Sequence, residues 1–178
     1  IIDNDLHIHS KISSCSNDIL IAEYKDMSPV IFPDYRDVVV PANIAPLNFQ
    51  VEESYGQTVL MVEYGDVRRY VKARKGLVSF RSGVWRSMME DACGSDIKMP
   101  VCVKEGGSWT ACSPFTLTVV EDEIDPYIAY RLIPPGYTMW KEMSIAQRSL
   151  EDYGETRIYN NLQGRGNCVN CHSFRDRD

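Results

Sequence analysis

Short alternating runs of apolar and polar residues, punctuated by turn signals, are the feature that most constrains the fold of this chain. Residues 47–51 and 67–73 alternate in this way. Side chains of a strand point to opposite faces in turn, so alternation is typical of strands with one buried face. Gly65-Asp66 separates 67–73 from the β-rich run 58–64, and this arrangement predicts a hairpin. The chain is therefore predicted to be mainly β.

A second hairpin is predicted around Gly106-Gly107, from residues 97–104 and 109–120. Apolar residues at helical spacing predict a short helix over 84–92 and another over 140–150. Short strands at this density, with turns between them, favour two packed sheets. The predicted fold is an immunoglobulin-like β-sandwich with one or two short helices.

Composition divides the 178 residues into three parts, within the size of one ordinary domain with a core. Residues 1–36 are polar and irregular, and we interpret them as an extended N-terminal arm or tether. Residues 37–138 hold most of the predicted strands and form the β-sandwich domain. Residues 139–178 combine the second helix with an irregular C-terminal segment that carries the haem motif described below.

Charge and apolar patterning exclude several classes of function. The formal net charge is −6, so the chain offers little attraction to phosphate backbones, and we expect no nucleic-acid partner. Its apolar runs are only a few residues long, which is too short for a helix that spans a bilayer. Six cysteines are many for a cytosolic chain of this size and indicate an exported protein.

The C-terminal segment contains Cys168-Val169-Asn170-Cys171-His172, which is the C-x-x-C-H attachment signature of c-type haem. Two thiols three positions apart can each add to one vinyl group of the same haem. The histidine that follows is then placed to coordinate the iron as the proximal ligand. We therefore predict one covalent haem c per chain, held by Cys168, Cys171 and His172.

Other chemistries use the same residue types as this motif. A zinc site would need two further ligands, and the other cysteines form no second C-x-x-C pair. A thioredoxin-like redox pair would lie between a strand and a helix of a βαβ unit, whereas this motif lies in an irregular segment. A disulfide between Cys168 and Cys171, or a clip for another metal, is the alternative to haem.

A haem iron that only carries electrons usually takes a second axial ligand. Met139 and Met143 are the methionines nearest the motif in sequence and are the candidate distal ligands. Met143 also falls on the apolar face of the helix predicted over 140–150, where a methionine would be core filler. A five-coordinate iron, or a ligand from another protein, is the alternative. His7 and His9 form an H-x-H pair, although solvated histidines fit their polar, terminal neighbourhood.

The other cysteines offer a disulfide. Cys102 and Cys112 flank the second predicted hairpin, and a three-residue loop at Gly106-Gly107-Ser108 would place them opposite each other, within reach of a bridge. A bridge from Cys93 to either of them, or buried thiols, are the alternatives.

Cys15 is a candidate lipid anchor. It follows Ile12-Ser13-Ser14, which resembles the lipobox of bacterial lipoproteins. The residues before it lack the apolar run of a signal peptide, so an unmodified exposed thiol is the alternative.

Acidic residues give no firm sign of catalysis. Asp91 with Asp96, or the run Glu121-Asp122-Glu123, match catalytic carboxylates in type, but solvated surface charges have the same composition. The chain shows no Ser-His-Asp order, phosphate loop or H-E-x-x-H helix. We expect no substrate turnover by this chain alone.

Several longer strings resemble one group of large envelope proteins of Gram-negative bacteria. Two lie early, at Ile31-Phe32-Pro33-Asp34-Tyr35 and Pro41-Ala42-Asn43-Ile44-Ala45-Pro46-Leu47-Asn48-Phe49. A third is Tyr130-Arg131-Leu132-Ile133-Pro134-Pro135-Gly136-Tyr137, and the most distinctive is Asn167-Cys168-Val169-Asn170-Cys171-His172-Ser173-Phe174. The group resembles lipoproteins with a β-rich N-terminal domain, a CVNCHSF segment and a TolB-like β-propeller with PD40-type repeats. Its members are often labelled cytochrome c biosynthesis proteins.

The resemblance covers nearly all of residues 19–174 and implies a location in the periplasm or at the cell surface, as in outer-membrane lipoproteins. It also implies a propeller following Asp178. We predict an exported c-type cytochrome-like module that transfers electrons to a redox partner or another envelope protein. The alternative is a non-enzymatic immunoglobulin-like module whose C-x-x-C-H is a disulfide or metal clip. Such a module would bind a protein or glycan through exposed aromatics, with Trp85, Trp109 and Trp140 as candidates.

Overall fold

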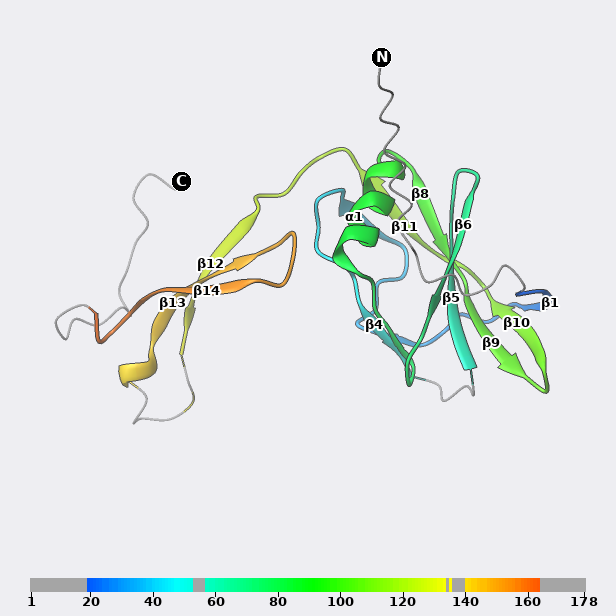
Figure 1. Cartoon of the computed structure of the whole chain (residues 1–178), viewed down its shortest axis with the longest axis horizontal. Coiled ribbons are helices and arrows are strands. Elements are labelled where there is room, and N and C mark those ends of the chain that lie inside the picture. Colours follow the sequence, from blue (N-terminus) through cyan, green and yellow to red (C-terminus); the bar gives the residue numbers. More distant parts are fainter. Residues whose placement is uncertain (1–18, 53–56, 134, 136–139, 164–178) are drawn as a thin grey trace, which may run out of the picture. The chain divides into compact units, whose positions relative to one another are not determined.

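The computed structural model describes residues 19–52, 57–133, 135 and 140–163. Within them the chain forms three sheets, one α-helix, α1 (Ser82–Asp91), and one short 3-10 helix, η1 (Trp140–Glu142) (Figure 1). No helix in this described part is long and apolar enough to cross a membrane. The prediction of a mainly β protein is confirmed.

The largest sheet has eight strands. In order across it run β1 (Ile21–Lys25), β10 (Ser108–Cys112), β9 (Val101–Glu105), β5 (Gln57–Tyr64), β8 (Asp96–Met99), β11 (Phe115–Val120) and β3 (Val38–Pro41), and β6 (Val67–Lys72) pairs with β5 beside this path. A second sheet has the order β2 (Ile31–Phe32), β4 (Phe49–Val51) and β7 (Leu77–Val78). The third has the order β12 (Tyr127–Leu132), β13 (Ser144–Ser149) and β14 (Glu155–Asn160).

The fold divides into two compact units, each built from segments that are distant in sequence. The described residues of Ile1–Val38, Asn48–Ser79 and Ile97–Leu117 form the first unit. Those of Val39–Leu47, Phe80–Asp96 and Thr118–Asp178 form the second. Each unit therefore depends on pairing between residues that the chain brings together only on folding.

Two hairpins form the centre of the first unit. Strands β5 and β6 pair antiparallel around the Gly65-Asp66 turn. Strands β9 and β10 pair antiparallel around Gly106-Gly107, whose φ angles of 56° and 92° lie in the left-handed region that a tight two-residue turn uses. Strand β9 also pairs with β5, so both hairpins belong to one sheet. Both hairpin predictions are confirmed.

Strand β5 is buried on both of its faces. Leu60 and Val62 point to one face and Val59 and Met61 to the other, and each is at most 4% exposed. Apolar residues on both faces remove the alternation expected of a strand at the surface. This strand therefore belongs to the interior of the first unit, with apolar layers above and below it.

The sheet β2–β4–β7 provides a second layer of the first unit. It buries Phe49, Val51 and Val78. The ring of Phe49 meets Phe115 of β11 in an edge-to-face contact with centroids 5.9 Å apart. Sheets that enclose a shared apolar layer are consistent with the predicted β-sandwich. The immunoglobulin-like arrangement of that prediction is not confirmed.

Part of the segment that the sequence places in an extended arm is paired into the sheets. Strand β1 is a parallel edge strand beside β10, with Ile21 opposite Trp109. An ion pair from Lys25 Nζ to Glu105 Oε2, 3.2 Å long, joins β1 to the β9–β10 hairpin. Strand β2 pairs antiparallel with β4. Neither strand is adjacent to its partner in the sequence, so a local pattern cannot reveal either pairing.

Helix α1 confirms the helix predicted over 84–92. It buries three residues on one face, Trp85, Met88 and Met89. The indole Nε1 of Trp85 donates a hydrogen bond to the carbonyl oxygen of Ile44 at 2.8 Å. The ring centroids of Trp85 and Phe80 are 4.8 Å apart. Trp85 is therefore a core residue of the second unit, and it is not an exposed aromatic.

The helix predicted over 140–150 is wrong, because only η1 is helical there and β13 follows it. Strand β13 pairs with β12 along one edge and with β14 along the other. Ser144 and Ala146 are fully buried at alternate positions, as a strand requires. Pairing on both edges provides hydrogen-bond partners for the backbone N–H and C=O groups of β13. This hydrogen bonding outweighs the loosely helical spacing of its apolar residues.

The turn between β13 and β14 is tied to the segment that follows β3 in the same unit. The N–H of Ala45 donates to the carbonyl oxygen of Leu150 at 2.7 Å. The side-chain amide of Asn43 donates to Glu151 Oε1 at 3.2 Å. These contacts connect the β12–β13–β14 sheet to residues 43–45, where the carbonyl oxygen of Ile44 accepts the Trp85 hydrogen bond.

We expect Trp85→Ala to lower the free energy of unfolding by about 3–5 kcal/mol, because it opens a cavity in the core and leaves the Ile44 carbonyl without its donor. Denaturant unfolding followed by circular dichroism measures this change. The matched control is the neighbouring, exposed Arg86→Ala, expected to change stability by no more than about 0.5 kcal/mol. A loss below about 1 kcal/mol for Trp85→Ala would contradict this account of the second unit.

Candidate functional site

The haem signature lies outside the described residues. Cys168, Cys171 and His172 follow Gln163, the last residue that the structure describes. Also outside the described residues are Met139, Cys15, His7 and His9. The structure instead describes the turn and the sheet from which the motif departs.

A tight turn ends the described chain directly after β14. The Oδ1 atom of Asn160 accepts hydrogen bonds from the backbone N–H of Leu162 at 3.0 Å and of Gln163 at 3.1 Å. In return, Gln163 Oε1 accepts the backbone N–H of Asn160 at 2.9 Å. Asn161, between them, is fully buried. The chain is therefore held in a defined conformation five residues before Cys168.

Met143 lies beside this turn. Its carbonyl oxygen accepts the backbone N–H of Asn161 at 3.2 Å, and the residue is half-buried just before β13. It does not lie on a helix, so its interpretation as filler on an apolar helix face no longer applies. Met143 therefore lies next to the end of β14, the strand that precedes the C-x-x-C-H motif in the chain.

The sheet β12–β13–β14, which carries this turn, exposes many apolar side chains. They are Tyr127, Ile128, Ile158, Tyr159 and, beyond the strand ends, Ile133 and Leu162. Leu162 is 62% exposed although it follows the fully buried Asn161. Tyr127 and Ile128 are consecutive in β12, as are Ile158 and Tyr159 in β14, so exposed apolar side chains lie on both faces of this sheet.

The predicted opposition of Cys102 and Cys112 is off by one residue. The β9–β10 turn has two residues between Glu105 and Ser108, so Cys102 lies opposite Ala111. Both sulfurs are thiols in the structure, not halves of a disulfide. The Cys102 thiol donates to the carbonyl oxygen of Pro100, with sulfur and oxygen 3.8 Å apart.

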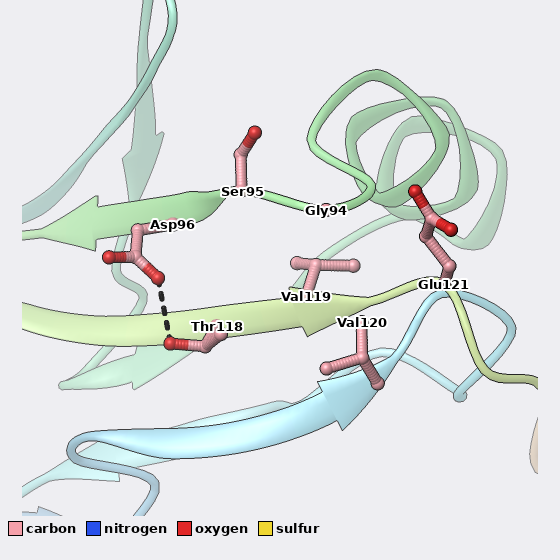
Figure 2. A pocket seen from close by; sticks show the side chains of 7 residues that line it. All are labelled: Gly94, Ser95, Asp96, Thr118, Val119, Val120 and Glu121. Carbon is pink, nitrogen blue, oxygen red and sulfur yellow. Dashed lines mark hydrogen bonds between the residues drawn. The ribbon is translucent and has the colours of Figure 1, made fainter.

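Two of the acidic residues considered as catalytic, Asp96 and Glu121, line an open depression of about 480 Å³ in the second unit (Figure 2). Asp96 and Glu121 lie at opposite ends of it, and Oδ1 of Asp96 accepts the Thr118 hydroxyl at 2.7 Å. Asp91 ends α1 and is not among the lining residues. Within the described ranges, no three His, Cys, Asp or Glu side chains are grouped to hold a metal ion.

One face of the eight-stranded sheet brings together residues whose proximity the sequence alone does not reveal. Cross-strand neighbours share a face of a sheet, so the strand registers define rows across it. One row runs through β6, β5, β9, β10 and β1 as Lys72, Val59, Cys102, Ala111 and Tyr24. The next row runs through β5, β9, β10 and β1 as Gln57, Lys104, Trp109 and Ile21.

Aromatic side chains cover the centre of this face. Ile21, Tyr70 and Trp109 pack on a buried floor formed by Met61, Cys102 and Ala111. We define the aromatic sheet face as Ile21, Tyr24, Tyr70, Lys72, Lys104 and Trp109. Of the three tryptophans considered above, Trp109 is therefore the partly exposed one, Trp85 is buried, and the side chain of Trp140 lies outside the description.

No family model, curated protein or solved structure matches this chain.

Burial raises the pKa of the Cys102 thiol from its ordinary 9.0 to about 11, and the nearby Cys112 adds to the shift. The native state thus keeps a proton that the unfolded chain releases. We expect stability to fall as the pH rises from about 9 to about 11, by up to about 3 kcal/mol. Cys102→Ala should remove this part of the decline in denaturant unfolding.

The exposed Cys93 provides the control for this prediction, since Cys93→Ala leaves the buried thiol in place. Its unfolding curves should keep the wild-type dependence on pH. A Cys102→Ala protein that loses the same stability over this range as wild type would contradict the assignment.

Proposed function

We propose that this protein is an exported c-type cytochrome-like module that carries one covalent haem and transfers electrons in the bacterial envelope. The observation that carries the proposal is the segment Cys168-Val169-Asn170-Cys171-His172. The residue types and their spacing match what covalent haem attachment requires. The resemblance to Gram-negative envelope lipoproteins supports the same location and a redox partner or envelope protein as the partner.

The donor set fits haem in its chemistry. Each thiol of Cys168 and Cys171 can add its sulfur and its hydrogen across one vinyl double bond, which forms a thioether without any oxidant or reductant. The imidazole of His172 supplies the proximal nitrogen. When bound, haem supplies a one-electron couple, and the protein supplies attachment, an axial ligand and apolar cover.

The turn after β14 supports the proposal because it limits where the motif can lie. Cys168 is the fifth residue after Gln163, and five extended residues span at most about 18 Å. A thioether bond at Cys168 would therefore lie within that distance of the described turn. The exposed apolar side chains of the β12–β13–β14 sheet, Ile158 and Leu162 among them, provide surface within that reach for a large apolar group.

Met143 would supply a second, sulfur ligand to the iron if haem is bound, and it is the candidate that this arrangement favours. Its backbone hydrogen bond to Asn161 keeps it beside the strand end that leads to the motif. The thioether of a methionine paired with histidine is a common ligand set in cytochromes c and raises the reduction potential. Met139 is the second candidate, four residues earlier in the sequence.

The test of the proposal is haem attachment in protein exported together with a c-type maturation apparatus. We expect a stoichiometric pyridine haemochrome and a sharp α band after reduction with dithionite. The double variant Cys168→Ser, Cys171→Ser should lose the haem and keep its circular dichroism, since the described sheets do not contain these residues.

Cys93→Ser is the matched control, because it removes an exposed thiol outside the motif and should leave the haem content unchanged. Wild-type protein without covalent haem under these conditions would overturn the proposal. Equal haem in the double variant would overturn the assignment of the two cysteines.

We expect Met143→Ala to keep the covalent haem but to lose the weak far-red absorption band that a sulfur–iron(III) bond produces, and to lower the reduction potential. Met27→Ala, at an exposed methionine of the first unit, should change neither property. An unchanged spectrum in Met143→Ala, together with loss of the band in Met139→Ala, would transfer the role to Met139.

A further inference from the structure

We propose that the aromatic sheet face binds an anionic polysaccharide that carries uronic-acid carboxylates. This inference goes beyond the haem proposal and rests on different residues, all of them in the first unit. It assigns a ligand class to a surface formed by strands β1, β5, β6, β9 and β10.

Two of the three aromatic rings of this face, Tyr70 and Trp109, are held in place from below. Tyr70 and Trp109 are half-buried. They pack on Met61, Cys102 and Ala111, and these three floor residues are each at most 1% exposed. Tyr24 completes the face and is 66% exposed. Rings that are fixed on one side and open on the other lose little conformational freedom when a ligand stacks on them.

The charge of this face is opposite to that of the whole chain. On these five strands its charged side chains are Arg68, Lys72, Lys104 and one acid, Glu63. Glu63 is already paired, because its Oε1 lies 2.6 Å from Nη2 of Arg68. The two lysines form no ion pair in the described part of the chain. A protein of net charge −6 thus presents two uncompensated cations beside aromatic rings.

The two lysines lie next to the rings that would hold a sugar. Lys104 is opposite Trp109 in the register, and its Nζ lies 5.8 Å from the centroid of the indole. Lys72 is two residues after Tyr70 in β6, so the two side chains are neighbours on this face. An anionic group bound by either lysine would therefore bring its own molecule against an aromatic ring.

A uronic-acid polymer matches this combination better than an acidic peptide does. Each of its rings has a flat C–H face that can stack on Tyr24 or Trp109, and a carboxylate on the same ring can reach a lysine. An acidic peptide carries its carboxylates on flexible side chains and has no flat apolar surface beside them. The pairing of rings with cations on this face therefore favours the sugar.

Binding of the full chain to polygalacturonate, alginate and hyaluronate tests the inference, measured by titration calorimetry at low ionic strength. We expect at least one of these polyuronates to bind, and neutral dextran not to bind. The triple variant Tyr24→Ala, Lys72→Glu, Lys104→Glu should weaken binding at least about tenfold, from the lost stacking and two reversed charges.

Matched controls change the same residue types in the second unit. Tyr127→Ala and Lys141→Glu are exposed there and should bind as wild type does. If the triple variant does not fold, as judged by circular dichroism, the single variant Tyr24→Ala at the most exposed position still tests the stacking contribution.

Three results would overturn the inference. The first is that none of the three polyuronates binds the wild-type chain. The second is that poly-glutamate, which has carboxylates but no rings, binds as tightly as the polyuronates. The third is that folded Tyr24→Ala and the folded triple variant bind as wild type does. Haem content is not involved, so these outcomes are independent of the cytochrome proposal.

Discussion

The pairing of β5 on both of its edges is the constraint on which the first unit depends. This strand joins β6 along one edge and β9 and β8 along the other. Its two faces bury apolar side chains as well, with Leu60 and Val62 on one and Val59 and Met61 on the other. One face contributes to the apolar interior, and the other is the floor of the aromatic sheet face. A single strand thus supports both the stability of the unit and the surface to which we assign a ligand.

The haem proposal concerns the end of the second unit. The turn after β14 is fixed by Asn160 and Gln163, and the buried Asn161 connects it to Met143. A C-x-x-C-H segment that begins five residues later starts from a defined point on an exposed apolar sheet. Covalent attachment suits such a position, because thioether bonds hold a haem where little protein surrounds it. The two proposals therefore concern separate surfaces on separate units of one β scaffold.

Local signals in the sequence predicted the features that depend on local physics. The two hairpins follow from Gly65-Asp66 and Gly106-Gly107, and α1 from the spacing of its apolar residues. The disulfide geometry failed because the second turn has two residues instead of three, which shifts Cys102 opposite Ala111. Strand β13 was mistaken for a helix because its partners β12 and β14, which satisfy its backbone, are not visible in its own pattern. The rows of the aromatic sheet face depend on a parallel pairing between β1 and β10, and no local pattern encodes that pairing.

The central claim is that Cys168 and Cys171 hold a haem covalently, and intact-mass spectrometry under denaturing conditions tests it most directly. Denaturation releases any haem that is only coordinated, so a retained group must be attached through bonds to the chain. The account predicts a mass higher by one haem per chain, with the added mass on the peptide that contains residues 168–172. An unmodified mass for protein exported with a c-type maturation apparatus would contradict the account. The motif would then be a disulfide or a metal clip.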